Sequence, residues 1–135
     1  MYAVEVREHV MIAHSLAGEV FGPAQKLHGA TYVVDVAFMG EALTDSAILV
    51  DIGAATTLVQ DVLKPLNYAN LDALPEFAGK ITTTEFLARH VFDRVAAAMR
   101  EGRLGHGAEG VSRLRVTLNE SHVARAWYEG EPWAG

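Results

Sequence analysis

Residues 26–38 read Lys-Leu-His-Gly-Ala-Thr-Tyr-Val-Val-Asp-Val-Ala-Phe. The stretch is rich in β-branched and aromatic side chains, a composition typical of a well-packed strand. We predict a strand over these residues, with His28 near its start. The segments before and after it predict the other elements of the fold.

The segment before it alternates between apolar and polar residues. Val4, Val6 and His14 fall on even positions, whereas charged and polar side chains take most of the odd ones. A period of two is typical of a strand with one face in water, so we predict a strand over residues 2–16. Residues 17–23 contain two glycines and a proline and are predicted to form the loop between the two strands.

Two helices are predicted in the middle of the chain. Residues 54–66 carry leucines and valines at helical spacing. After an irregular connection over residues 67–80, the sequence Thr82-Thr-Thr-Glu85 has the pattern of a capping box, in which Glu85 bonds back to the helix start. Apolar residues then mark one face of a second helix that ends near Arg100.

Two further strands are predicted in the C-terminal part. Residues 113–118 alternate in type and residues 123–128 are strand-like, so a hairpin around 119–121 joins them. The resulting order, ββααββ, favours an α+β fold in which a four-stranded antiparallel sheet carries both helices on one face. Because such a sheet has two open edges, we expect a homo-oligomer.

Composition narrows the class of protein. The 135 residues suit a single domain over 1–135, and 50% of them are hydrophobic. The net charge of -6 is scattered along the chain, so we expect no nucleic-acid partner and no membrane partner. There is no cysteine, so a metal would be held by His, Asp or Glu. The charged N-terminal segment lacks a signal-peptide pattern, so we predict a cytoplasmic protein.

His14 and His28 lie at the facing ends of the first two predicted strands, and the loop between them lets the two side chains meet. Neutral imidazole is a good zinc ligand, so the pair would supply half of a metal site. The alternative is an ordinary hydrogen-bonded pair, because zinc normally takes at least three protein ligands.

Glu120 lies at the predicted hairpin, where a glutamate is ordinarily solvated. In a pocket, its carboxylate would accept two parallel N–H donors from an amidine-like edge, such as that of a pterin or guanine ring. His122 is of interest because it shares its parity with Glu120. Glu85 has two possible roles: it either caps the second helix or contacts the ligand.

Several segments together resemble the 6-pyruvoyl tetrahydropterin synthase and 6-carboxytetrahydropterin synthase family over nearly the whole chain. They follow one another in the family's order and agree with the predicted strands and helices. The segments are Ile12-Ala-His14, Lys26-Leu-His28-Gly-Ala-Thr-Tyr32, Val50-Asp51-Ile52, Pro65-Leu-Asn-Tyr-Ala-Asn-Leu-Asp72, Thr83-Thr-Glu85-Phe-Leu-Ala88 and Val116-Thr-Leu-Asn-Glu120-Ser121.

The resemblance implies a tunnelling fold, whose members form trimeric barrels that commonly stack as hexamers, with active sites between subunits. It also implies zinc as a cofactor and a small heterocycle as the substrate. His14 and His28 match two zinc ligands, and Glu120 matches the glutamate that grips the pterin edge. Thr83 and Glu85 fall in a matching segment and are carried over as substrate-binding residues.

Other positions depart from the family pattern. Ala30 replaces the third zinc ligand, so either another residue such as His122 completes the ligand set or the metal is weakly bound or absent. Ala24 stands in place of the catalytic cysteine, and the catalytic Asp-His pair corresponds to Asn67-Tyr68. The usual proton-transfer groups are therefore missing.

Proton transfer to a ring side chain needs a positioned acid and base. Tyr68, Lys26 and His122 are the candidates for these catalytic roles. We expect either a lyase of this family with altered chemistry or, as the alternative, a non-catalytic pterin-binding, purine-binding or assembly protein. A third interpretation, an ordinary 6-carboxytetrahydropterin synthase, requires that the substitutions are compensated elsewhere.

Overall fold

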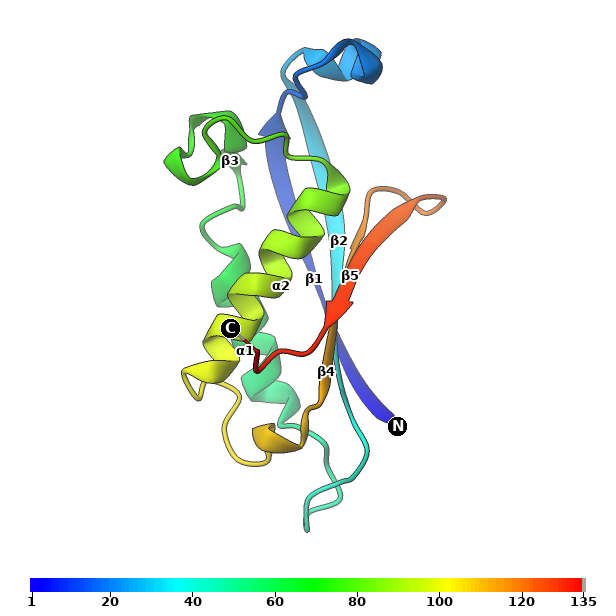
Figure 1. Ribbon diagram of the computed structural model, residues 1–135, viewed down its shortest axis with the longest axis vertical. Helices are drawn as coiled ribbons and strands as arrows, with labels where there is room; N and C mark the ends of the chain where they lie inside the picture. Colours follow the sequence, from blue (N-terminus) through cyan, green and yellow to red (C-terminus); the bar gives the residue numbers. More distant parts are fainter. Residues whose placement is uncertain (135) are drawn as a thin grey trace.

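The computed structural model describes residues 1–134 and is built around one long antiparallel pair of strands (Figure 1). Strand β1 (Tyr2–His14) pairs with β2 (His28–Gly40) along its whole length. The register places His14 directly opposite His28. The buried side chains of β1 fall on even positions, as its period of two predicted. Both strands predicted before the helices are thereby confirmed. β1 begins at the predicted residue and ends two residues earlier than predicted, and β2 is shifted by two residues at both ends.

The sheet differs from the predicted one. In residues 1–134 it has five strands in the order β3-β1-β2-β4-β5. β4 (Arg113–Asn119) and β5 (Arg125–Gly130) form the predicted hairpin. The additional strand, β3 (Ala69–Asn70), lies between the helices in sequence and runs parallel to β1 at the sheet edge. The prediction of four antiparallel strands in the order ββααββ was therefore wrong, because a strand of two residues shows no periodicity.

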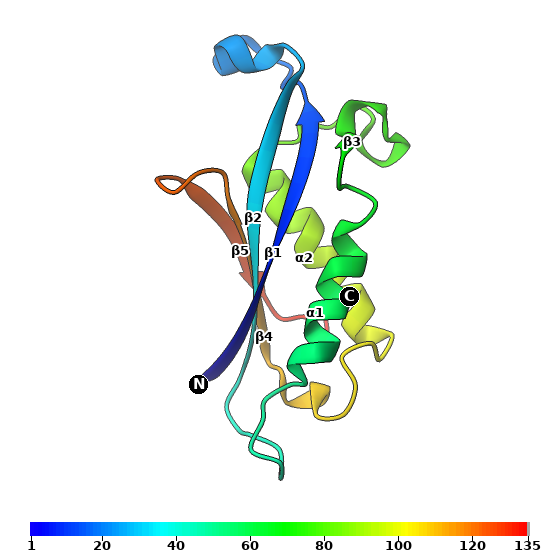
Figure 2. The same ribbon diagram turned by 180° about the vertical axis from the view of Figure 1, so that it is seen from behind.

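Two helices cover one face of the sheet, as predicted (Figure 1, Figure 2). α1 (Ile52–Leu63) and α2 (Thr84–Arg100) lie on the same side of the strands. Leu58 of α1 and Val91 of α2 belong to one apolar core with Phe38 of β2, and all three are almost fully buried. Burying a side chain of this kind contributes ~1.5–3 kcal/mol. This layer supplies the main core and confirms the α+β architecture with two main helices.

Side-chain caps set the helix starts. The Asp51 carboxylate accepts hydrogen bonds from two backbone amides at the start of α1. The Thr83 hydroxyl accepts one from the amide of Phe86 at 3.1 Å and begins α2. Because the cap is Thr83 rather than Thr82, Glu85 does not lie at the third helical position that a capping box requires. The predicted capping box was wrong, and the Glu85 side chain is exposed.

Short 3-10 segments connect the main elements. η1 (Glu19–Gln25) adds local helical order to the loop predicted over 17–23 and projects beyond the end of the sheet where β1 finishes and β2 begins (Figure 1). η2 (Leu71–Ala73) and η3 (Pro75–Phe77) lie in the stretch between the helices, and η4 (Ala108–Gly110) precedes β4.

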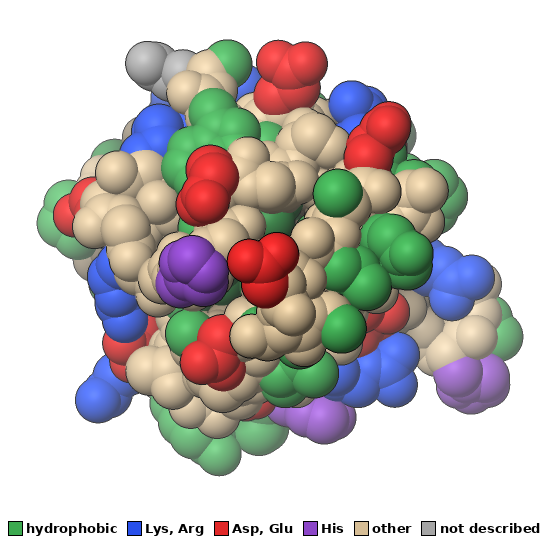
Figure 3. Space-filling model, turned by 90° about the horizontal axis from the view of Figure 1, so that it is seen from below, with side chains coloured by type: hydrophobic (Ala, Val, Ile, Leu, Met, Phe, Trp, Pro, Cys, Tyr) green, Lys and Arg blue, Asp and Glu red, His purple; other side chains and the backbone are tan. Residues whose placement is uncertain are grey.

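The helices leave the opposite face of the sheet uncovered (Figure 2). This face carries charged side chains that pair between neighbouring strands. Arg7 of β1 pairs with Asp35 of β2, and Glu129 of β5 bridges Arg113 and Arg115 of β4. At the end of the molecule opposite η1, acidic side chains are scattered among apolar and neutral ones (Figure 3). Within residues 1–134, no helix combines the length and apolar character needed to cross a bilayer.

Candidate functional site

His14 and His28 meet at the end of the β1–β2 pair. Their ring centroids are 4.7 Å apart, with an angle of 63° between the ring planes. The Nδ1 atom of His14 lies 3.0 Å from the hydroxyl oxygen of Thr82. The Nδ1–H of His28 donates to the carbonyl of Lys26 at 2.9 Å, an arrangement in which Nε2 is the acceptor of the neutral ring. The strand register therefore brings the two imidazoles together, with both rings oriented by a partner.

His14 is the more buried of the two histidines, with 2% of its surface exposed. Burial lowers the pKa of its imidazole, and the neighbouring His28 acts in the same direction. Asp72, the backbone of Thr82 and Glu120 oppose this shift without reversing it. The net direction favours the neutral imidazole, the form in which a ring nitrogen accepts a hydrogen bond.

The two histidines line a cavity of about 560 Å³, a volume within the range of ligand pockets. Its wall comes from the ends of β1 and β2, from η1, from the start of α2 and from the turn after β4. The lining also includes Glu120, Thr83 and Glu85. Five residues predicted from separate parts of the sequence are thus gathered in one place.

Glu120 reaches this cavity from the turn after β4, and the Thr84 hydroxyl donates to its Oε2 at 3.5 Å. Tyr32 lines the same cavity and is 2% exposed. Burial raises the pKa of the Tyr32 phenol, a hydrogen bond with Thr84 lowers it, and the carboxylates of Glu120 and Glu85 raise it. Tyr32 and Thr84 were missed in the sequence. The available signal was that Tyr32 shares the parity of His28 on one strand.

Three predicted residues lie elsewhere. Of the residues that the structure describes, Tyr68, Lys26 and His122 do not line this cavity. Tyr68 is 80% exposed next to β3, and its backbone amide donates to the carbonyl of Met11. His122 lines a neighbouring cavity together with Arg125. The structure therefore does not bring His122 to the imidazole pair as a third ligand, because the turn after β4 breaks the strand parity on which that idea depended.

Zinc fits this donor set incompletely. Ala30 lines the cavity beside the two histidines and has no donor atom. Among residues 1–134, no three His, Asp or Glu side chains lie close enough together to hold a metal ion. Catalytic zinc usually takes three protein ligands. His14 and His28 alone therefore fall one ligand short within a single chain.

Comparison with known protein families gives a match over nearly the whole chain. Residues 3–131 match the family model described as 6-pyruvoyl tetrahydropterin synthase. The chain belongs to this family. The resemblance seen in the sequence segments is thereby confirmed.

Two curated relatives agree with the family assignment. The chain is 30% identical over 107 residues to a 6-carboxy-5,6,7,8-tetrahydropterin synthase of Bacillus subtilis, which covers 71% of this chain and 68% of the relative. It is 26% identical over 85 residues to a 6-pyruvoyl tetrahydrobiopterin synthase of Dictyostelium discoideum, covering 62% of this chain and 63% of that protein.

Solved structures of the family share the fold. The 6-pyruvoyl tetrahydropterin synthase of Caenorhabditis elegans superposes with a TM-score of 0.78 at 22% identity, over 96% of both chains. The enzyme of the same name from Plasmodium vivax gives 0.75 at 16% identity, over 97% of this chain and 99% of that one. At these identities the likeness establishes the tunnelling fold alone.

Proposed function

We propose that this chain is a lyase of the 6-pyruvoyl tetrahydropterin synthase or 6-carboxytetrahydropterin synthase type that acts on a pterin or a related GTP-derived heterocycle. The observation that carries the proposal is the single cavity in which His14, His28 and Glu120 lie together. Family membership supports it, since the two curated relatives are named as synthases of this kind.

Glu120 is the proposed anchor of the ring. A carboxylate that accepts two parallel N–H bonds suits the amidine-like edge of a pterin, and such charge-assisted bonds are stronger than neutral ones. Thr84 already donates to one carboxylate oxygen, and Thr83 and Glu85 line the same cavity from the start of α2. The start of α2 is therefore the proposed contact region for the rest of the ring.

Tyr68, Lys26 and His122 remain the proposed proton-transfer residues. All three are exposed and lie outside the cavity of their own chain. A catalytic acid or base must come within hydrogen-bond reach of the substrate. We therefore propose that the active site forms between copies in a homo-oligomer, a trimer or a hexamer, in which a neighbouring copy supplies Tyr68.

Zinc has no assigned step, because the histidine pair does not complete its ligand set. His14 and His28 are the proposed ligands if the assembled protein binds the ion. We expect clearly less than one zinc per chain, and elemental analysis of the purified oligomer measures this ratio. One zinc per chain would show that a third ligand is supplied on assembly.

A second candidate function is non-catalytic binding of a pterin or purine, or a role in assembly, on the same fold. Ala24 and Ala30 both line the cavity, and neither carries a group that transfers a proton. This observation favours ring recognition without turnover.

The experiment combines binding with turnover. Neopterin binding is measured by calorimetry for the wild type, for Glu120→Gln and for the control variant Glu41→Gln. Glu41 is an exposed glutamate in the turn after β2. We expect affinity to fall by at least ~10-fold for Glu120→Gln, equivalent to ~1.4 kcal/mol, because the amide offers one acceptor oxygen and a donor NH2 where two parallel N–H donors need two acceptor oxygens. The Glu41 variant should bind like the wild type.

Turnover is followed by chromatography after incubation with dihydroneopterin triphosphate. Product formation supports the lyase. Neopterin binding without any product after prolonged incubation favours the second candidate instead. If the wild type fails to bind neopterin, or if Glu120→Gln binds as tightly as the wild type, the ring-binding role is overturned.

A further inference from the structure

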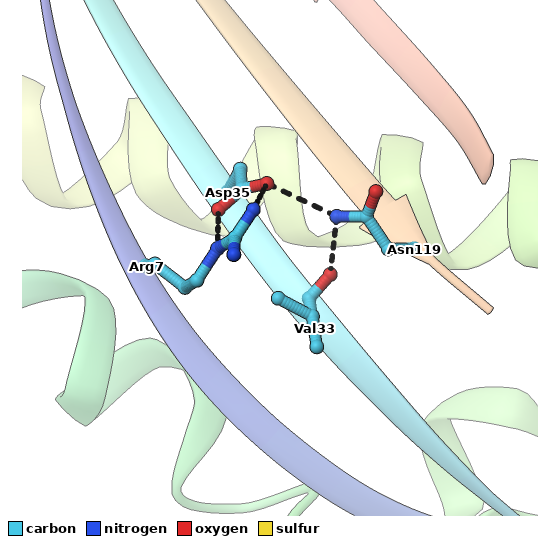
Figure 4. Close-up of polar contacts among 4 residues, drawn as sticks. All are labelled: Arg7, Val33, Asp35 and Asn119. Carbon is cyan, nitrogen blue, oxygen red and sulfur yellow. Dashed lines mark hydrogen bonds and ion pairs between the residues drawn. The ribbon is translucent and has the colours of Figure 1, made fainter. Parts of the chain in front are cut away.

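The uncovered face of the sheet holds a hydrogen-bond network centred on Asp35, a residue with only 7% of its surface exposed (Figure 4). Its Oδ1 accepts from Nε of Arg7 at 2.7 Å, and its Oδ2 accepts from Nη2 of the same guanidinium at 2.9 Å. This bidentate pairing fixes the plane of the carboxylate as well as its position. Asp35 is thus a rigid acceptor between β1 and β4.

Asn119 completes the network from β4. Its Nδ2 donates to Oδ2 of Asp35 at 3.0 Å and to the carbonyl of Val33 at 2.9 Å. An amide nitrogen has two hydrogens, so both are used. Figure 4 shows the three strands joined in this way, with Arg7 on β1, Val33 and Asp35 on β2, and Asn119 on β4.

The position of Asn119 in the chain connects this network to Glu120. Asn119 is the last residue of β4, where it pairs with Val33 on one side and Arg125 on the other. The next residue is Glu120, whose amide donates to the carbonyl of Ala124 at 3.1 Å across the turn. Glu120 lines the cavity with the two histidines directly after this last strand residue. Fixing Asn119 on the uncovered face therefore fixes the backbone from which the Glu120 side chain extends.

Glu120 has little to hold it by itself. In the part of the chain that the structure describes, its side chain is exposed and its one hydrogen-bond partner is Thr84, at the long distance of 3.5 Å. Its direction is consequently set by the backbone of the strand end. A binding group is effective only when its neighbours hold it in the productive geometry.

We propose that Asn119 is a positioning residue that fixes Glu120 for ring binding, and that Asp35 and Arg7 hold Asn119 in place. The inference rests on the ring-binding role proposed for Glu120. Asn119 does not line the cavity with the two histidines but the neighbouring one of about 480 Å³, which it shares with Glu120. It therefore acts through Glu120 and not by contact with the ring.

The first measurement tests the backbone directly. Hydrogen exchange at the Glu120 amide is compared between the wild type, Asn119→Ala and Thr117→Ala, a control that alters the same face of β4 two residues earlier. Local opening determines exchange, so loss of the Asn119 side chain should raise the Glu120 rate at least ~10-fold relative to the control. Equal rates in the two variants would overturn the proposal whatever the ligand affinity.

The second measurement is a double-mutant cycle on neopterin affinity with Asn119→Ala, Glu120→Ala and the double variant. We expect Asn119→Ala to weaken binding ~10-fold in the wild-type background and to have no further effect when Glu120 is already alanine. The control Thr117→Ala should keep wild-type affinity.

The outcomes separate this inference from the proposed function. If Asn119→Ala weakens binding as much without Glu120 as with it, Asn119 contacts the ligand itself and the positioning role is wrong. If Glu120 exchange rises in Asn119→Ala but Glu120→Ala leaves neopterin affinity unchanged, the network does orient the turn and the ring-binding function is the part that fails.

Discussion

The two faces of the sheet are held together by different kinds of interaction. On the helix-covered face, Val34, Val36 and Phe38 of β2 have no exposed surface. On the uncovered face, Arg7 and Asp35 join neighbouring strands through a charged pair instead. Apolar burial is strong and non-directional, whereas a bidentate ion pair is directional and largely offset by desolvation. The covered face therefore sets stability, and the uncovered face sets strand alignment and the direction of the turn after β4.

The largest expected effect is on the covered face. Phe38→Ala removes a side chain that is fully buried, so we expect the free energy of unfolding to fall by about 3–5 kcal/mol. Urea denaturation measures this change. The matched control is Met39→Ala, the next residue of β2, which is only half-buried on the other face. Equal losses of unfolding free energy for the two variants would show that the two faces do not differ in their contribution to stability.

The next effect tests the uncovered face. Asp35→Asn keeps the shape of the side chain but offers one acceptor oxygen where the network uses two, so we expect a loss of about 2 kcal/mol at pH 7. The Arg7 hydrogen bond, followed by that of Asn119, lowers the pKa of Asp35, and burial opposes this shift. Arg125 adds to the lowering through its charge.

This shift also gives the variant a pH signature. A carboxyl whose pKa is lower folded than unfolded stabilises the protein above its unfolded pKa of about 3.9, and that stability is lost as the pH falls through the lower folded value. The difference between the wild type and Asp35→Asn should therefore stay constant from pH 7 to 5 and shrink below about 4. Denaturation curves at pH 7, 5 and 3 check this, and a difference that persisted at pH 3 would contradict it.

Much of the fold was predictable because periodicity reports burial. The period of two in β1 and the helical spacing in α1 and α2 arise because each element buries one side in the core on the covered face. The predictions that failed depended on features without a period. β3 is two residues long, and the cap of α2 lies at Thr83 because its hydroxyl faces the amide of Phe86, a choice among three neighbouring threonines that sequence alone does not make.

The positions of site residues could be predicted where those residues lie on regular strands or helices. Residues on regular strand ends or at the start of α2, such as His14, His28 and Glu85, line the cavity. His122 does not, because it lies in a turn where parity no longer applies. Tyr68 lies outside the cavity of its own chain at a left-handed backbone position, which no pattern in the sequence indicated.

A smaller effect is expected where the covered face meets the site. Thr83→Ala removes the cap of α2, and we expect a loss of about 1 kcal/mol. Thr84→Ala at the next position removes no cap and should cost clearly less stability, although it removes the hydroxyl that donates to Glu120. Thermal and urea unfolding of the two variants separate these contributions, and a larger loss for Thr84→Ala would place the cap elsewhere.

The smallest effect belongs to the outer edge of the uncovered face. Glu129 accepts from Arg113 at 2.5 Å and from Arg115 at 2.6 Å, and these hydrogen bonds lower the pKa of its carboxyl. All three side chains are partly in water, so Glu129→Gln should cost only about 0.5 kcal/mol in dilute buffer. In 1 M salt the difference from the wild type should vanish, because the Debye length is then only about 3 Å. The Asp35→Asn loss should largely persist in the same salt, since its carboxylate is buried. If both losses vanished together, the uncovered face would be a uniform charged surface, and Asp35 would have no special part in directing the end of β4.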